Sequence, residues 1–251
     1  MNSFVQLLSS APPSGWEEGL LFQIWQNFIY QDRYMFIVRG LGITAQITIG
    51  AVIIGLTLGF FVALAKISEN KILRSIATVY ITIIRGIPVL IQLMIWWFAV
   101  FGLTWVRLFG AGAPTVPIIW VAIIAFGINS GAYVTEIFRA GILSIDKGQT
   151  EAGRSVGLTK FQTLRLIILP QAVKNALPAL FNELITLFKL TSIASVIGVR
   201  DLTEAANIII SRTFEPWLPL LAVAVTYLII VIILTWVMTL IERRLRKGDS
   251  R

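Results

Sequence analysis

Cysteine and histidine are both absent from this 251-residue chain. Without cysteine there is no disulfide framework, thiolate metal site or cysteine nucleophile, and without histidine there is no imidazole base or ligand. Charge is also scarce, at 14% of residues against about 25% in an average soluble protein. Hydrophobic residues reach 57%, and the mean hydropathy is +0.83. This composition excludes most hydrolytic and metal chemistry and indicates lipid as the natural solvent.

Five apolar segments divide the chain, and each is long enough to cross a bilayer as a helix of about 20 residues. They are Ile43–Ala65, Ile76–Leu103, Val116–Glu136, Ala176–Val199 and Pro216–Leu240. The second segment contains Gly86 and Pro88, which predict a kink or a tilt within it. The fourth is the least apolar because it carries Asn182, Glu183 and Lys189. The sequence therefore predicts an all-α integral membrane protein with five transmembrane helices.

The basic residues are distributed unequally between the two sides of this arrangement. One side collects Lys66, Lys71, Arg74, Arg139, Lys147, Arg154, Lys160, Arg165, Lys174, Arg243, Arg244, Arg246, Lys247 and Arg251. The other side collects Arg33, Arg39, Arg107, Arg200 and Arg212. The richer side is expected to be cytoplasmic, and an odd number of spans then places the N-terminus outside and the C-terminus inside. The net charge of +8 is attributed to membrane topology, and no nucleic-acid partner is expected.

Residues 1–35 precede the first span on the expected outer side. They lack the basic start of a signal peptide and contain Glu17 and Glu18. Polar residues recur at helical spacing in this segment: Gln23, Gln26, Asn27 and Gln31. Two interpretations stay open, a helix lying in the outer interface of the membrane or a disordered lead-in.

The longest loop on the expected cytoplasmic side covers residues 139–174. Within it Glu151–Ser155 can form a short helix, for which Gly157 is available as a C-terminal stop. Ala152 and Gly153 leave one face of this helix almost bare, so another protein's backbone could approach closely. The same loop contains Gly148, Gln149, Arg154, Leu169 and Pro170. The proline allows a sharp bend back into the membrane. A solvated turn that contains a short helix is the alternative interpretation.

A family resemblance emerges from the spacing of this loop. The residues run Glu151-Ala152-Gly153, three residues, Gly157, nine residues, Ile167, one residue and Leu169-Pro170. This pattern resembles the EAA signature of ABC importer permeases, which marks the cytoplasmic coupling helix that docks into a groove on the ATPase subunit. Gly153 departs from the signature, which usually has a second alanine there. Glycine costs about 1 kcal/mol of helix propensity but keeps the face small, so docking is expected to survive.

Further motifs narrow the resemblance to permeases for polar amino acids. The run Arg85-Gly86-Ile87-Pro88-Val89-Leu90-Ile91-Gln92 is similar to their Arg-Gly-x-Pro-x-Leu-x-Gln stretch. Ala132-Tyr133 with Glu136, Arg139 and Gly141 is similar to a second segment, and Asn182-Glu183, Lys189, Thr191 and Ser192 to a third. Leu190 and Ile193 depart from the third.

The resemblance implies a type I importer fold over residues 36–246, followed by a short cytoplasmic tail, 247–251, in a bacterial inner membrane. It also implies an ABC ATPase dimer, a second permease subunit that is either a copy or a paralogue, and an extracytoplasmic amino acid-binding protein. The chain itself contains no Gly-Lys dipeptide and hence no Walker A loop. No enzymatic activity and no cofactor are therefore expected in this chain, because ATP would be bound by the partner subunit.

Polar residues inside the expected spans are candidates for the substrate path, since charges at bilayer depth usually face a bundle interior or water. These candidates are Arg85, Gln92, Asn129, Ser130, Tyr133, Glu183, Lys189, Thr191 and Ser192. Together they offer donors for a carboxylate and acceptors for an ammonium, as a zwitterion requires. Glu183 is the leading candidate, whereas structural pairing or packing is the alternative for Arg85, Lys189 and Tyr133.

Two other functions remain open from the residues alone. A secondary transporter would couple to an ion gradient and would more often show a detectable repeat or broken helix pairs. A structural membrane subunit would need neither the polar stripe nor the small-faced loop.

Overall fold

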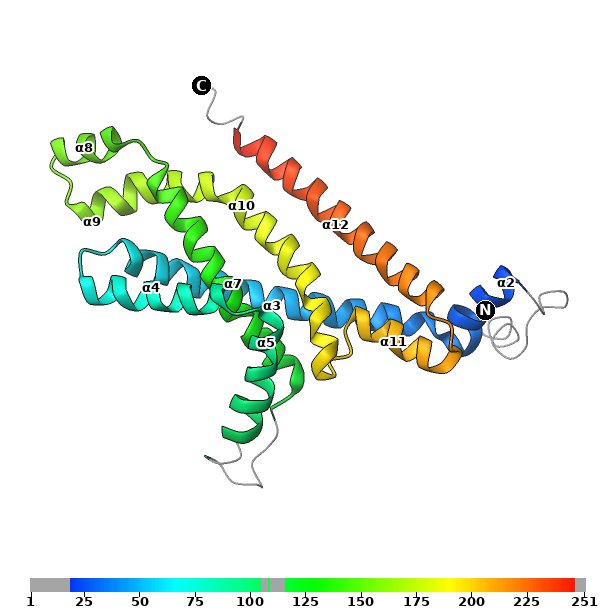
Figure 1. Cartoon of the computed structure of the whole chain (residues 1–251). Coiled ribbons are helices and arrows are strands. Elements are labelled where there is room, and N and C mark those ends of the chain that lie inside the picture. The colour runs from blue at the N-terminus through cyan, green and yellow to red at the C-terminus, as the bar shows by residue number, and fades with distance from the viewer. Residues whose placement is uncertain (1–18, 105–107, 109–115, 247–251) are drawn as a thin grey trace.

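The computed structural model describes residues 19–104, 108 and 116–246, and every regular element within them is a helix (Figure 1). Four helical stretches are long and apolar enough to cross a membrane: Tyr34–Ile67, Ile118–Leu143, Lys160–Ile197 and Trp217–Arg244. A bent pair of helices makes a fifth if the two are taken as one span. The predicted all-helical membrane class is therefore confirmed for the described residues.

Helices α3 (Tyr34–Ile67) and α7 (Ile118–Leu143) form the most intimate pair of the bundle. Their contact is made possible by small residues. A Cβ built on Gly59 would lie 2.5 Å from a methyl carbon of Val134, and one on Gly55 would lie 3.0 Å from Ser130. Because glycine has no side chain, the two backbones can approach closely at these two positions. Here a Gly-x-x-x-Gly pair serves packing inside the bundle.

The predicted second span is broken into two helices. Helix α4 (Lys71–Gly86) is followed by α5 (Val89–Met94) and the π-helix η3 (Ile95–Thr104), with a bend of 103° between the two halves. Ile87, which precedes the proline, is extended at φ −106° and ψ 132°, because the proline ring disfavours helical geometry in the residue before it. The expected kink lies where Gly86 and Pro88 place it, but it is a complete break with a near-perpendicular exit.

The chain reverses direction between α8 (Lys147–Ser155) and α9 (Lys160–Thr163) at one end of the bundle (Figure 1). From α9 it continues through the π-helix η4 (Leu164–Ile168), α10 (Leu169–Leu190) and the 3-10 helix η5 (Thr191–Ile197) as one long helical run. Pro170 lies just after the π-helix η4, and the two residues before it, Ile168 and Leu169, keep helical φ and ψ, so the helical run continues through the proline. The expected sharp bend at Pro170 is therefore wrong, and the turn before α9 reverses the chain instead.

Helices α11 (Leu202–Thr213) and α12 (Trp217–Arg246) complete the bundle. Asp201 caps α11 by accepting the backbone N–H of Glu204 at 2.9 Å, and its neighbour Leu202 donates its N–H to the Thr44 hydroxyl at 3.1 Å. The bond between Leu202 and Thr44 joins the start of α11 to α3. The sequence analysis did not predict α11, because the mixed polar and apolar residues of this helix do not form an apolar run.

The segment before α3 is helical where it is described, as α2 (Leu20–Ile24), the π-helix η1 (Trp25–Ile29) and the 3-10 helix η2 (Tyr30–Asp32). Asn27 is buried in it and donates to the backbone oxygen of Gln23 and to Glu215. The helical alternative fits this part of residues 1–35, but Asn27 faces the protein instead of solvent.

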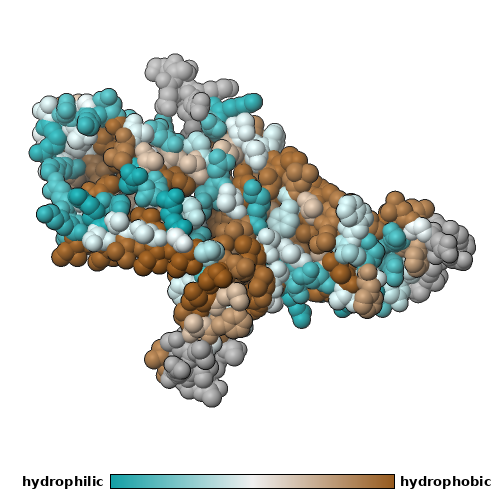
Figure 2. All heavy atoms as spheres, viewed as in Figure 1, coloured by the Kyte–Doolittle hydropathy of each residue, from teal (hydrophilic) through white to brown (hydrophobic). Residues whose placement is uncertain are grey.

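The outer surfaces of α4 and α12 carry the apolar side chains that a lipid environment requires. On α4, Ile72, Ile76, Val79 and Ile83 are all exposed and form one helical stripe. Figure 2 shows hydrophobic residues along α4 and over α12, whereas hydrophilic residues gather at the end formed by α8 and α9. The turn between α3 and α4 lies at this same end, so two of the basic loops expected in the cytoplasm lie together.

Candidate functional site

The helical hairpin formed by α8 and α9 contains the loop motif predicted from the sequence. Asp146 caps α8 by accepting the Gly148 N–H at 2.6 Å. At the other end Gly157 has φ +86°, and the next residue, Leu158, donates to the Gly153 carbonyl at 3.1 Å. This is the left-handed glycine termination of a helix. The predicted stop at Gly157 is correct, and α8 starts four residues earlier than expected, at Lys147.

Ala152 and Gly153 of α8 lie in different environments. Gly153 is buried, and a Cβ at this position would lie 2.8 Å from a methyl carbon of Thr163 and 3.0 Å from one of Ile167. Ala152 is exposed. The bare face is thus divided: glycine lets α8 pack on α9 and η4, whereas alanine faces outward. This explains in physical terms why glycine replaces the second alanine of the signature.

The outward surface of the hairpin combines small, polar and apolar residues. Gly148, Gln149, Glu151 and Arg154 are exposed together with Ala152. Arg154 also donates to the Leu158 carbonyl at 2.9 Å, which fixes the turn. Two large apolar side chains, Val156 (76% exposed) and Phe161 (69% exposed), were missed by the sequence analysis. Isolated apolar residues in a polar loop give no periodic signal, so only the structure shows them on this surface.

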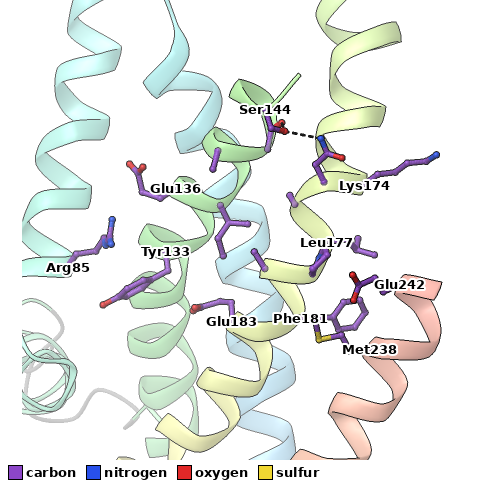
Figure 3. A pocket seen from close by; sticks show the side chains of 17 residues that line it. Arg85, Tyr133, Glu136, Ser144, Lys174, Leu177, Phe181, Glu183, Met238 and Glu242 are labelled. Atoms are coloured by element: carbon purple, nitrogen blue, oxygen red, sulfur yellow. Dashed lines mark hydrogen bonds between the residues drawn. The ribbon is translucent and has the colours of Figure 1, made fainter. Parts of the chain in front are cut away.

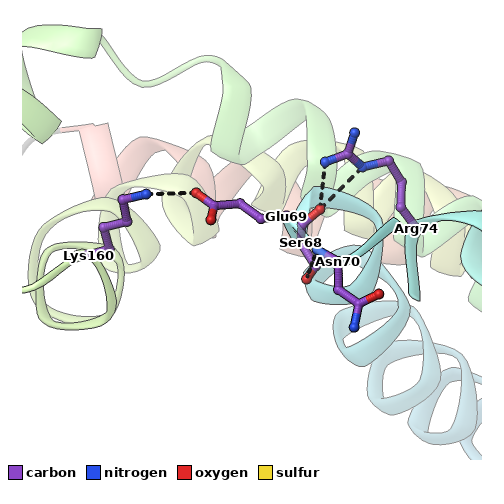
Figure 4. Close-up of polar contacts among 5 residues, drawn as sticks. All are labelled: Ser68, Glu69, Asn70, Arg74 and Lys160. Carbon is purple, nitrogen blue, oxygen red and sulfur yellow. Dashed lines mark hydrogen bonds and ion pairs between the residues drawn. The ribbon is translucent and has the colours of Figure 1, made fainter. Parts of the chain in front are cut away.

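The hairpin is connected to the turn between α3 and α4 (Figure 4). Lys160 Nζ lies 2.7 Å from Glu69 Oε1, and Arg74 donates twice to the Ser68 carbonyl. The hydrogen bond and the charge of Lys160 hold the pKa of Glu69 below its ordinary value. Both side chains of the ion pair are well exposed, so solvent screens their attraction and the pair contributes little to stability. The contact lies between α9 and the turn that joins α3 to α4.

A cavity of about 700 Å³ opens among α4, α7, α10 and α12 (Figure 3). Five charged side chains line it: Arg85, Glu136, Lys174, Glu183 and Glu242. Lys174 and Glu242 were not predicted, because they come from the ends of two helices that are far apart in the sequence. Glu136 is paired with Arg139 at 2.7 Å, a contact between neighbouring turns of α7 near the loop.

A second cavity of about 430 Å³ lies against the break between α4 and α5. The two cavities share three lining residues, Arg85 from α4, Tyr133 from α7 and Glu183 from α10. The Arg85 guanidinium carbon lies 5.1 Å from the centre of the Tyr133 ring, within cation–π range. The Glu183 carboxylate accepts the Ser130 hydroxyl at 2.8 Å. Figure 3 shows the tyrosine between the arginine and the glutamate.

Gln92 and Asn129 are buried beside this group and bonded to each other. Asn129 Nδ2 donates to Gln92 Oε1 at 3.3 Å, and Gln92 Nε2 donates to the carbonyls of Ile84 and Ile87. Asn129 lines the smaller cavity. Gln92 is not among the described residues that line either of the two cavities.

Three further candidates lie away from these cavities. Among the described residues, Lys189, Thr191 and Ser192 line neither of them. Thr191 is buried and donates its hydroxyl to the Phe188 carbonyl at 2.7 Å, while Lys189 is exposed at the end of α10. Leu169 and Pro170 form the first turn of α10, away from the outward surface of α8. The candidate site thus reduces to the group around Tyr133 and to the hairpin.

A polytopic helical bundle with a charged cavity and an exposed helical hairpin at one end is the architecture of a membrane permease. The chain matches the family described as binding-protein-dependent transport system inner membrane component over residues 55–247. It is 41% identical to the putative glutamine transport system permease protein of Rickettsia bellii, over 86% of this chain and 95% of that protein. It is also 41% identical to the arginine transport system permease protein of Bacillus subtilis, over 85% and 94% of the two chains.

Solved structures give the same result. A chain of the crystal structure of an amino acid ABC transporter with histidines matches with a TM-score of 0.75 and 40% identity, over 84% of this chain and 94% of that one. A chain of a methionine ABC transporter in an inward-facing conformation has the same fold, with a TM-score of 0.68 and 22% identity. The chain therefore belongs to the family of binding-protein-dependent transport system inner membrane components and is a multi-pass protein of the bacterial inner membrane. The predicted membership of the ABC importer permeases is confirmed.

Proposed function

We propose that this protein is the permease subunit of an ABC importer for polar amino acids, and that it forms the translocation path around Arg85, Tyr133 and Glu183. The observation that carries the proposal is the placement of two opposite charges on either side of Tyr133, on the wall shared by two cavities. The volume of the larger cavity, about 700 Å³, falls within the roughly 300–1,000 Å³ of ligand pockets. The relatives, whose names refer to glutamine and arginine, support the substrate class.

The chemistry of the site fits a zwitterion. Arg85 presents a guanidinium that can donate two parallel hydrogen bonds to an α-carboxylate. Glu183 keeps one carboxylate oxygen on the Ser130 hydroxyl, which orients the other acceptor positions for an α-ammonium or a basic side chain. The Tyr133 ring between them offers an apolar face to the carbon skeleton of the substrate. The hydrogen bonds and charges that the site supplies therefore match the groups that all amino acids share.

The outward surface of α8, with Gln149, Glu151 and Ala152, would dock on an ABC ATPase dimer, which binds and hydrolyses the ATP. A second permease subunit, a copy of this chain or a paralogue, and an extracytoplasmic binding protein would complete the importer. The hairpin would lie in the cytoplasm, with the N-terminus outside, the C-terminus inside and the bent pair of helices counted as a fifth span. ATP binds the ATPase subunits, and it would shift the bundle between inward- and outward-facing states because the complex binds ATP with different affinity in each state.

The test replaces Glu183 by glutamine and by alanine in the assembled permease–ATPase complex, without the binding protein. Binding of L-arginine and L-glutamine is measured directly, and uptake is measured in vesicles that contain the full importer. Loss of a charged hydrogen bond at a ligand is worth about 1.5–3 kcal/mol, so the alanine variant should bind at least about tenfold more weakly. If Glu183 receives a basic side chain, the Glu183→Gln variant should lose more affinity for L-arginine than for L-glutamine.

The matched control is Glu204→Gln, an acid on α11 that bonds to Asn207 outside both cavities. It should bind and transport as the unmodified protein does. Wild-type binding and uptake in both Glu183 variants would remove this residue from the substrate path. Uptake that persists in the absence of any ATPase subunit would contradict the importer assignment and favour a secondary transporter.

A further inference from the structure

The break between α4 and α5 creates an energetic problem inside the membrane. A helix that ends leaves its last four carbonyl groups without intrahelical partners. In the hydrocarbon region each such group costs several kcal/mol unless the protein supplies a donor. At this break Ile87 is extended and Pro88 has no N–H, so neither can extend the hydrogen-bond pattern of α4.

One side chain supplies donors to one carbonyl of the last turn of α4 and to one carbonyl of the linker. The Gln92 amide nitrogen donates to the Ile84 carbonyl at 2.6 Å and to the Ile87 carbonyl at 2.7 Å, so both of its hydrogens are used. The side chain is only 4% exposed. Its amide oxygen accepts from Asn129 on α7 at 3.3 Å. Gln92 therefore bridges three elements: the last turn of α4, the extended linker and the middle of α7.

The two carbonyls that Gln92 holds enclose Arg85 in the sequence, because Ile84 precedes it and Ile87 follows two residues later. Fixing both peptide groups fixes the backbone from which Arg85 extends toward Tyr133. We infer that Gln92 is a positioning residue, which clamps the helix break so that the Arg85 guanidinium is held at the wall shared by the two cavities. This inference rests on the proposed function, since it assigns Arg85 to the substrate.

A separate bond makes the role of Gln92 testable. Tyr80, two turns earlier on α4, donates its hydroxyl to the Ile128 carbonyl of α7 at 2.6 Å. This contact holds α4 against α7 independently of the break. Loss of the Gln92 amide should therefore release the last turn of α4 locally and leave the bundle assembled.

The first experiment compares Gln92→Leu and Gln92→Glu in the purified permease–ATPase complex. The leucine removes all polar atoms, while the glutamate keeps the shape and removes both N–H donors. Each should weaken binding of L-arginine and L-glutamine by about tenfold, the effect of losing a typical buried hydrogen-bonding group. The complex should still assemble, because the Tyr80 bond to α7 is unaffected, but its melting temperature should fall because two buried carbonyls lose their donor. Gln171→Leu is the control, because Gln171 donates to one carbonyl of its own helical run, away from the break.

A double-mutant comparison separates positioning from a general packing effect. In an Arg85→Ala background the Gln92 substitutions should weaken binding by less than twofold, because the group that they misplace is gone. A full tenfold loss in that background would overturn the inference. If Arg85→Ala alone leaves binding unchanged, the proposed substrate site fails, and the state of the break is judged by a measurement that needs no substrate.

That measurement uses the absence of native cysteine. A Cβ at Gly86 meets nothing within 4 Å, so Gly86→Cys introduces a single thiol in the break itself without a clash. Gln92→Leu should change the rate at which this thiol reacts with a small methanethiosulfonate reagent by about fivefold or more, since opening of the clamp alters local exposure. An unchanged rate would refute the clamp whatever the substrate proves to be. If the leucine variant does not assemble, the glutamate variant carries the same two measurements.

Discussion

Introducing the same large residue at two adjacent positions of α8 should separate folding of the hairpin from docking of a partner. Ala152 faces outward and is exposed, whereas Gly153 is packed against α9 and η4. We therefore expect Ala152→Leu to leave the hairpin folded and to block the ATPase, and Gly153→Leu to disrupt the hairpin itself.

The magnitude for Gly153 follows from its surroundings. A Cβ alone would lie 2.8 Å from Thr163 and 3.0 Å from Ile167, and a leucine adds three more carbons in the same direction. Overpacking of this kind costs about 1–3 kcal/mol. The gain in helix propensity on replacing glycine offsets about 1 kcal/mol of it, which leaves a net loss of up to about 2 kcal/mol. Alanine at Gly153 should cost less than leucine, but Thr163 would still have to shift to admit its Cβ.

The assay measures ATP hydrolysis, amino acid uptake and limited proteolysis of the α8–α9 turn in the same reconstituted samples. Ala152→Leu should lower uptake and substrate-stimulated ATP hydrolysis with proteolysis unchanged. Gly153→Leu should accelerate cleavage in the hairpin by up to about 30-fold, because 1.4 kcal/mol corresponds to a factor of 10 in a local opening equilibrium and the net loss reaches about 2 kcal/mol. Equal proteolysis of the two variants would refute the assignment of Gly153 to the packed face of α8 and of Ala152 to the exposed face. Full transport by Ala152→Leu would refute docking of the ATPase at this position.

Two further predictions concern charged groups outside the spans. Glu69→Lys and Lys160→Glu should each lower coupled transport by displacing α9, and the double exchange should recover most of it because the ion pair re-forms with reversed polarity; single variants with unaltered transport would show that the pair is incidental. Burial raises the pKa of Asp201 from 3.8 to about 6, so the folded state loses about 3 kcal/mol as the pH rises from about 4 through 6. Asparagine caps a helix equally well and does not ionise, so Asp201→Asn should match the melting temperature at pH 4 and exceed it at pH 8. A difference in melting temperature that does not vary with pH would contradict this account.

The sequence predicted those features that depend on local chemistry. The stop at Gly157 needs only a residue that tolerates a positive φ. The break near Pro88 was predicted in position but not in size. The residue before a proline must leave the helix, yet a turn of 103° inside a membrane also requires Gln92 to satisfy the carbonyls that it frees.

Other features depend on contacts between distant segments. The inward direction of Gly153 is set by Thr163 and Ile167, which the chain reversal brings under α8. Likewise Glu242 reaches the same cavity as Lys174 and Glu183 of α10 only because α12 lies alongside α10. No spacing within one segment could show these contacts. The apolar pattern alone also could not detect α11, whose buried side faces α3 and whose other side is polar.

The long helical run Lys160–Ile197 connects two regions that are far apart in function. Its first turn carries the lysine bonded to the α3–α4 turn, and its middle carries Glu183 at the cavity wall. At a rise of 1.5 Å per residue these two positions are separated by about 35 Å of helix. The π-helix η4 and Pro178 interrupt regular α-helical geometry between the two positions. For a segment of that length that turns as one body, a pivot of about 5° at the hairpin end corresponds to a displacement of about 3 Å at the other position, roughly the length of a hydrogen bond. In the proposed importer, a small angular movement at the hairpin would therefore suffice to make or break a contact between Glu183 and a solute.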